Sequence, residues 1–446
     1  MGSIALPMAY GLPFAGLLLS IALLPMFASR FWENHQGKIA TLWVLAWWIP
    51  YALNVDGPRA FHSIVSTALI DFIPFIVMVF GLYTVAGGLF LEGAFAGTPA
   101  RTTAFLAFGS LLASVIGVSG ASIVLVRPLV RGLPERRIQA HSVVFFIVLA
   151  CNVGGSLLPV GNPPLFLGVL HGVPFFWTLH TFPPMIFNVA ALLGIHYLID
   201  LRAFKKEGSP ADSIPTTKFG IQGAINLAFL ALIVLIVGVS GFVDLGDGGF
   251  LLMPSGPSGE EVKVGWIALC RDLSILAIAW LSLRFTAKEV REANSFSWGP
   301  IAELARLFAA IFACLIPLTE ILRQGENGSL AWLVRMVHRP AHYFWATGIL
   351  SSFLDNAPTY LLFFNVAGGG TPAGLQLLLT QTTTLVAISC GAVFMGANTY
   401  IGNAPNFLVR NIAEEDGLKM PSFFGYMAWS GAVLIPLFLL DTWIFF

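Results

Sequence analysis

Long apolar runs separated by short polar segments make up most of the chain. A run of about 20 apolar residues is long enough to cross a bilayer as a helix. Continuous runs of this kind lie at 9–29, 39–54, 63–92, 181–200, 221–241, 265–284, 303–322 and 421–445. The pattern predicts an all-α polytopic membrane protein, with room for roughly ten spans.

Two further apolar segments are interrupted at their centres. The segment 103–130 is broken at 117–122, and the segment 341–366 carries Asp355-Asn-Ala-Pro-Thr359 in its middle. Each arm is only about 12 residues long, which is too short to span a bilayer. We therefore predict two re-entrant hairpins that turn at these interruptions.

Two broken helices follow the hairpins, at 142–171 and 374–412. Their breaks repeat one another: shifting Gly155–Leu167 by 241 positions onto Gly396–Leu408 matches Gly-Asn-x-Pro-x-Phe-Leu and the first glycine. Proline and glycine disfavour a continuous helix, and such backbone survives at membrane depth only where protein or a wet cavity surrounds it. Matched breaks in two halves indicate a transporter's binding site. A single break would instead favour a kinked helix that has no role in binding.

The chain divides into a first half, 1–200, a polar linker, 201–218, and a second half, 219–446. If the linker is cytoplasmic, the loops 30–38, 131–141, 201–218 and 284–306 are cytoplasmic too, and together they hold 13 Lys and Arg. The loops 55–62, 242–264 and 323–342 hold 5. Because Lys and Arg favour the cytoplasmic side, this assignment gives the two repeats inverted topology.

Composition supports this interpretation. Charged residues are 10% of the chain and hydrophobic residues 57%, whereas soluble domains carry about 25% charged residues. The net charge is zero, so nothing indicates a nucleic-acid partner. Cysteine spacing indicates neither a disulfide framework nor a zinc site, and no phosphate-binding loop is present. We expect no cofactor and no enzymatic activity, with the lipid bilayer as the surroundings.

Asp355 is the strongest candidate for chemistry, since an ionisable group at membrane depth costs about 2.5–3.5 kcal/mol on insertion scales. Its carboxylate, Asn356, Thr359 and freed backbone carbonyls would form an oxygen cage for a hard cation such as Na⁺. The carboxyl could also take up a proton, because burial disfavours its charged form. Asp355 could instead cap a helix, and the two roles are compatible.

The breaks supply neutral polar groups. Asn162 and Asn403 can offer oxygen to a cation or N–H to an anion, and the half-helices that follow them direct positive dipole ends at the same region. We expect Na⁺ at Asp355, Asn162 and Asn403. Further expected site residues are Gly161, Thr399, Asn398, Ser119 and Ser122, with Asn152, Ser156 and Asn406 as additional donors nearby. Any single Ser or Thr could instead bond its own helix.

Other ionisable residues carry weaker signals. Asp71 and Glu320 lie on the long spans that precede the hairpins and are candidates for a proton path. Asp272 has Arg271 beside it, which favours a structural ion pair. His141, His171 and His180 fall near span ends, where an interfacial position is expected.

These motifs resemble a known family. Val153–Gly168, Gly120–Leu129 and Leu354–Tyr360 resemble the ion transporter superfamily, and more closely its citrate transporter and NhaD-type sodium:proton antiporter branch. The resemblance covers most of the chain. It implies an eleven-span-like inverted-repeat fold with a scaffold and a transport domain, an elevator movement, a homodimer, and ion sites at the hairpin tips and breaks. Asn162 stands where close relatives often have Asp, which leaves Asp355 as the one firm acid.

We therefore expect a multi-pass transporter of the inner membrane that exchanges Na⁺ for H⁺. The alternative is a Na⁺- or H⁺-coupled carrier of di- or tricarboxylates, in which Asn162 and Asn403 would face a small organic anion. The absence of a deep Arg or Lys near the breaks favours the cation. A channel subunit and an arsenite-efflux-like carrier are further alternatives.

Overall fold

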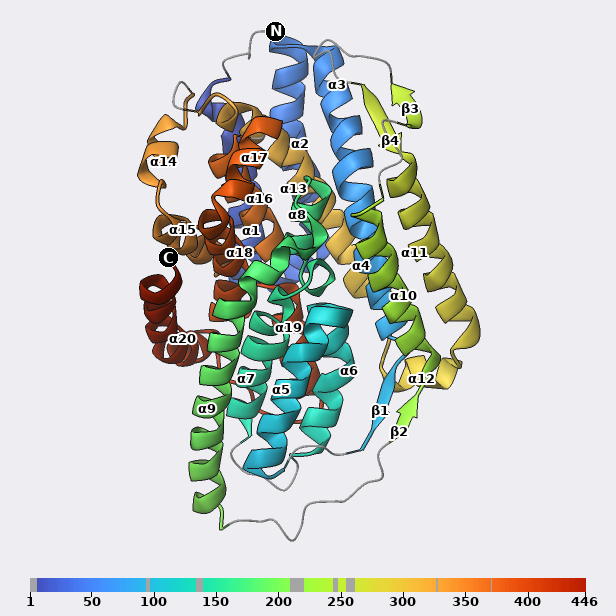
Figure 1. Cartoon of the computed structure of the whole chain (residues 1–446), viewed down its shortest axis with the longest axis vertical. Helices are drawn as coiled ribbons and strands as arrows, with labels where there is room; N and C mark the ends of the chain where they lie inside the picture. The colour runs from blue at the N-terminus through green and yellow to red at the C-terminus, as the bar shows by residue number, and fades with distance from the viewer. Residues whose placement is uncertain are drawn as a thin grey trace.

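Two groups of helices pack side by side, and each group draws on both halves of the chain. The computed structural model describes residues 6–93, 97–133, 139–208, 220–243, 248–253, 261–325, 328–369 and 371–446. Helices α10 and α11 lie along one side of the molecule, and α9 and α20 lie along the other (Figure 1).

The first group contains the long, mostly unbroken helices. Its members are α1 (Leu12–Phe27), α2 (Ser29–Asn54), α3 (Gly57–Ser66), the π-helical turn η2 (Thr67–Phe72), α4 (Ile73–Ala86), α10 (Ile225–Ser240), α11 (Trp266–Phe285) and α13 (Gly299–Leu322). The short helix η1 (Met8–Gly11) precedes α1, and α12 (Lys288–Ala293) connects α11 to α13.

The second group contains the hairpins and the broken helices. Its members are α5 (Pro99–Ile116), α6 (Val118–Arg131), α7 (Ala140–Ala150), α8 (Pro163–Leu170), α9 (Phe182–Lys206), α15 (Pro340–Ser351), α16 (Asn356–Gly368), α17 (Pro372–Thr380), α18 (Thr382–Met395), α19 (Ala404–Glu415) and α20 (Phe423–Phe445). Shorter pieces are η3 (Val153–Ser156), η4 (Pro159–Gly161), η5 (Phe175–Thr181), η8 (Gly396–Asn398) and α14 (Ala331–Met336).

Within the described ranges, seven helices are long and apolar enough to cross a membrane, and eight if the bent pair α17–α18 counts as one span. The chain is thus a polytopic membrane protein. The number is lower than the roughly ten expected from run length, because that expectation also counted the two broken helices and the run 221–241, whose helix α10 has only 16 residues.

Two small sheets correct the all-α expectation. The strand β1 (Phe90–Glu92) pairs antiparallel with β2 (Gly220–Gln222), and β3 (Gly249–Met253) pairs antiparallel with β4 (Val262–Gly265). The strands β1 and β2 lie at the ends of the apolar runs expected at 63–92 and 221–241, and β3 and most of β4 lie in the expected loop 242–264. Short segments that lie close together in the folded structure can pair their backbone N–H and C=O groups. Hydrophobic periodicity does not predict which segments come close together.

The expected loop 30–38 is also wrong, because α2 runs through it without interruption from Ser29. Polar side chains on an exposed helix face do not break a helix, and a side chain added at Gly37 would meet no atom within 4 Å. The linker boundary moves as well: α9 continues to Lys206, and positions 209–218 of the expected linker lie outside the described residues.

The first hairpin is built from α5 and α6, which contact each other on either side of Gly117. Gly117 has a φ of +79°, a conformation that a residue without Cβ adopts at little cost. The arms have 18 and 14 residues rather than about 12, because Thr98 caps α5 and Pro99 begins it four positions early. Since α5 alone is long enough to span a membrane, the re-entrant depth of this hairpin stays a prediction.

The second hairpin, α15–α16, turns at 352–355, close to the expected centre. The two breaks also fall where glycine and proline predicted them: α7 stops at Ala150 before α8 resumes, and α18 stops at Met395 before α19 resumes. An additional bend of 93° separates α17 from α18 near Gln381. The sequence analysis missed it because no proline or glycine marks the position.

Corresponding contacts support the sequence repeat. The Ser114 hydroxyl donates to the carbonyl of Gly154 at the first break, and the Ser352 hydroxyl donates to the carbonyl of Met395 at the second, over 3.1 Å. Gly154 and Met395 are related by the same shift of 241 positions. Each hairpin is therefore tied to the opening of its own break in the same way, while the inverted orientation of the repeats in the bilayer stays a prediction.

Candidate functional site

The two helix breaks meet through three asparagines. Asn152 from the first break donates its amide to Oδ1 of Asn406 over 2.8 Å. Asn403 donates in the other direction, to the carbonyl of Cys151 over 2.8 Å and to Oδ1 of Asn152 over 3.1 Å. All three side chains are buried. A buried amide needs partners for both its donor and its acceptor, so these bonds fix the breaks against each other.

The tip of the second hairpin joins this network through Asn356. With its amide oriented to satisfy both ends, Asn356 donates to the carbonyls of Ala392 and Gly402 at 3.0 and 2.9 Å and accepts from Asn403 over 3.2 Å. Gly396 lies directly against this amide, and a Cβ there would overlap Asn356. The glycine that opens the second break thus permits the hairpin tip to dock.

Asp355 lies beside this network at the junction of two helix N-termini. It is the N-cap of α16, where its carboxylate accepts from the amide of Ala357 over 3.2 Å. The backbone amide of Ala404, at the start of α19, also hydrogen-bonds this carboxylate. Asp355 is half-buried, and within the described part of the chain no Arg, Lys or His forms an ion pair with it. The expected capping role is present, and the charge has no fixed counter-ion among these residues.

Several expected site hydroxyls are occupied by bonds within the protein. Thr359 donates to the carbonyl of Asp355 over 3.1 Å, and Ser122 donates to the carbonyl of Val118 over 2.6 Å. Thr399 donates to the carbonyl of Ser352 and accepts from two backbone amides of its own loop. These three side chains shape the backbone of the site, and their oxygens are only partly available to an ion.

Other expected residues keep open polar atoms. Both amide atoms of Asn162 are buried without a hydrogen-bond partner among the described residues. Oδ1 of Asn398 is likewise unpartnered, while its amide donates to Ser352 over 2.8 Å. The half-buried hydroxyl of Ser119 makes no hydrogen bond within the same ranges. A buried unsatisfied amide is costly, so both amide atoms of Asn162 are open to a hydrogen-bonding partner.

Gly161, before Asn162, packs on the carbonyl of Gly155 with no room for a Cβ. Gly402 has the same relation to Gly396, whose carbonyl would lie 2.5 Å from an added Cβ. Both glycines let the chain fold back on itself directly before the asparagine that caps the following half-helix.

The two candidates for a proton path lie apart from the asparagine network and have partners. Glu320 on α13 forms an ion pair with Arg59 at 3.3 Å and accepts from the hydroxyl of Tyr51 over 3.0 Å. Asp71, in the π-helical turn, lies 3.8 Å from Nε2 of His171 at the end of α8. The Asp71–His171 contact therefore bridges the two helix groups. Arg271 and Asp272 form the expected ion pair at 2.8 Å.

Sequence reasoning missed one buried polar pair in the second group. The amide of Asn188 on α9 donates to both carboxylate oxygens of Asp441 on α20, at 2.8 Å each. The two residues are 253 positions apart, so no local pattern could have joined them. The sequence did show that Asp441 places a carboxylate within the last apolar run, and such a group needs a polar partner.

A family model described as "Putative citrate transport" matches residues 3–446, nearly the whole chain. The chain belongs to this citrate-transport family. No curated protein sequence matches the chain. As a member of the citrate-transport family, the protein is a multi-pass membrane transporter, in agreement with the resemblance seen in its motifs.

Proposed function

We propose that this chain is a cation-coupled secondary transporter that exchanges Na⁺ for H⁺ at Asp355. The observation that carries the proposal is a half-buried carboxylate with no basic partner among the described residues. A carboxylate withdrawn from water needs a compensating charge. Na⁺ and H⁺ can each supply it, and because they compete for one group, binding of one releases the other.

Oxygen atoms near the carboxylate suit a hard cation. The Asn398 carbonyl oxygen is unpartnered, and the backbone of the hairpin turn at 352–355 lies beside it through the bond from Asn398 to Ser352. Asn403 is a weaker candidate for an ion ligand than the sequence indicates, since its amide already serves the network. Asp355 and Asn398 are therefore the first candidates for Na⁺, with Asn162 as the expected ligand from the first break.

A Na⁺- or H⁺-coupled carrier of di- or tricarboxylates is the second candidate, and Asn162 is the observation that favours it. A buried amide with both ends unpartnered can donate to a carboxylate oxygen of a solute. The description of the matched family, citrate transport, agrees with this alternative. An organic anion beside Asp355 would require a cation between the two charges, so the coupling ion is common to both candidates.

The deciding experiment uses vesicles that contain the reconstituted chain and an inside-acid gradient. NaCl, LiCl and then citrate or succinate are added while a pH-sensitive dye is followed. A response to Na⁺ or Li⁺ alone that disappears in Asp355→Asn supports exchange. If the dye responds to neither salt and labelled carboxylate is taken up in a Na⁺- or H⁺-dependent way, simple exchange is refuted and the carboxylate carrier is supported.

The wider expectations of the resemblance complete the proposal. The chain would reside in the inner membrane as a homodimer, with the first helix group as scaffold and the second as the moving transport domain. The division into two groups supports an elevator movement, since the breaks and hairpin tips all belong to the second group.

A further inference from the structure

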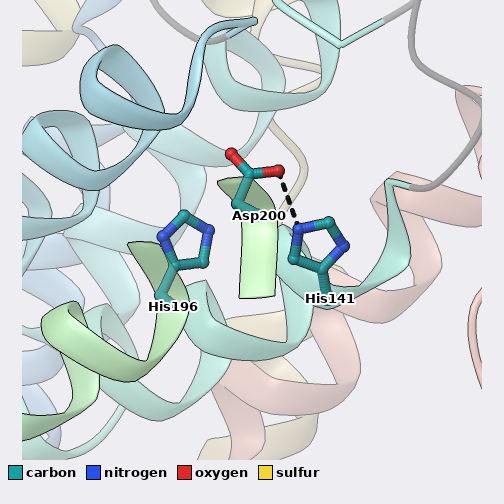
Figure 2. A group of neighbouring side chains, drawn as sticks. All are labelled: His141, His196 and Asp200. Atoms are coloured by element: carbon teal, nitrogen blue, oxygen red, sulfur yellow. Dashed lines mark hydrogen bonds and ion pairs between the residues drawn. The ribbon is translucent and has the colours of Figure 1, made fainter. Parts of the chain in front are cut away.

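A cluster of three ionisable side chains lies in the second group, apart from the breaks. His141 stands at the start of α7, and His196 and Asp200 stand on one face of α9, four positions apart (Figure 2). None of the three is more than 5% exposed. Helix α7 rises about 1.5 Å per residue, so the nine steps from His141 to Ala150 place the cluster roughly 14 Å from the first break. The expectation that His141 is interfacial did not anticipate a buried cluster.

The donor atoms converge. Nε2 of His141 lies 2.9 Å from Oδ1 of Asp200, and one ligand atom from each residue lies within 4.8 Å of the others. Figure 2 shows a ring nitrogen of His196 turned toward the carboxylate between the two rings. Zinc bonds to nitrogen and carboxylate oxygen are about 2.0–2.2 Å long, so the ligand atoms of one tetrahedral ion lie roughly 3.4 Å apart. Binding one ion would therefore require modest side-chain rotations from the distances seen here.

The surroundings of His196 select one of its two nitrogens. Nδ1 lies 2.9 Å from the hydroxyl of Thr103 on α5, and Nε2 lies 3.4 Å from the hydroxyl of Ser142 on α7. A histidine that binds a metal commonly donates its other N–H to an outer partner, which orients the ring and fixes its tautomer. Thr103 fills this role, leaving the Nε2 lone pair on the side of α7.

We propose that His141, His196 and Asp200 bind a divalent transition-metal ion, with Zn²⁺ the best match to two imidazoles and a carboxylate. The four-residue spacing on α9 presents two ligands on one face of a rigid helix, and α7 supplies the third. The ion would tie the start of the first broken helix to the helix that closes its repeat. The proposal does not depend on which solute the protein carries.

The test uses the purified full-length chain in detergent, treated with a chelator and titrated with Co²⁺ as a spectroscopic probe for Zn²⁺. We expect one equivalent to bind with visible absorption typical of a nitrogen and oxygen site, and Zn²⁺ to displace it. Because a ligand that binds only the folded state stabilises it, the metal should also raise the melting temperature. A chain without saturable binding would overturn the proposal.

Variants separate this site from surface binding. His196→Ala should remove the saturable Co²⁺ signal, and Asp200→Asn provides a nearly isosteric second variant if the first does not fold. Thr103→Val should weaken the affinity about 10–100-fold, the usual effect of losing an outer partner. The control is the double variant His338→Ala, His342→Ala, which removes an exposed pair of histidines whose rings pack edge to face. Retention of the signal in His196→Ala, or its loss in the control, would contradict the proposal.

Discussion

The amide of Asn152 donates to Oδ1 of Asn406 over 2.8 Å, and this bond joins residues 254 positions apart. It connects the interruption of one broken helix to the first turn of the half-helix that follows the other. Asn403 in turn donates to Oδ1 of Asn152, so each break donates a side-chain hydrogen bond to the other. The site therefore rests on a rigid polar centre, while the atoms left open lie around it.

Replacing Asn152 by Ala should destabilise the protein. The change leaves Oδ1 of Asn406 without its donor in a buried position, and each orphaned buried group costs about 1–3 kcal/mol. Thermal unfolding in detergent measures the effect. Asn365→Ala is the matched control, since among the described residues that buried amide bonds only the carbonyl of Leu361 in its own helix. Equal melting temperatures for the two variants would show that the network does not hold the breaks together.

Replacing Asp355 by Asn should abolish cation-coupled flux in a folded protein. The amide has nearly the same shape and can still cap α16, but it carries no charge for Na⁺ or H⁺ to balance. We expect the flux to fall at least about tenfold, the equivalent of ~1.4 kcal/mol. Dye dequenching in vesicles measures it, with Glu415→Gln as the control for loss of an exposed acid at the end of α19. Normal exchange in Asp355→Asn would disprove the carrier role.

Replacing Asn162 by Asp tests the other side of the site. The new carboxyl would be buried, and a buried carboxyl group releases its proton only at a higher pH than one in water. Exchange should persist with its optimum moved to higher pH, as followed by flux measurements across a pH series. Asn365→Asp, which places a new carboxyl at a buried site outside the breaks, serves as the control. An unchanged pH profile in Asn162→Asp would put this residue outside the ion site.

Replacing Gly402 by Ala should disrupt the second break. An added Cβ would lie 2.5 Å from the carbonyl of Gly396 and 2.8 Å from that of Ser351, and neither backbone atom can yield easily. Overpacking of this kind costs about 1–3 kcal/mol, and we expect lower thermal stability together with loss of flux. Gly431→Ala in α20 is the control, because no atom lies within 4 Å of a Cβ there. A fully active Gly402→Ala protein would contradict the assigned packing.

Cross-linking across the two groups tests the elevator movement. Asp71 and His171 approach within 3.8 Å from η2 and the end of α8. Cysteines at both positions, in a Cys270→Ser background that removes the exposed native thiol, should be joined by a short bifunctional thiol reagent. We expect the cross-link to stop flux and its reduction to restore flux, whereas the reagent should not lower the flux of either single-cysteine variant below its untreated level. Undiminished flux in the fully cross-linked protein would exclude a movement of α8 past η2.

The membrane character, the two hairpins and both breaks followed from the sequence itself. These features are local: apolar run length sets a span, Gly117 turns the chain between α5 and α6, and Pro163 and Pro405 lie in the first turns of the half-helices that follow the breaks. Asp355 was also recognisable from the sequence, because an acidic residue within an apolar stretch is costly at membrane depth and indicates a functional role.

The tertiary structure alone decided which polar atoms are in use. Thr399 and Asn403 look available in the sequence, yet their partners come from Ser352 and Cys151 on other elements, while Asn162 keeps both ends open. The sequence shows a donor's type but not its distance from partners hundreds of positions away. For the same reason, the approach of His141 to Asp200 could only emerge once α7 and α9 were packed together.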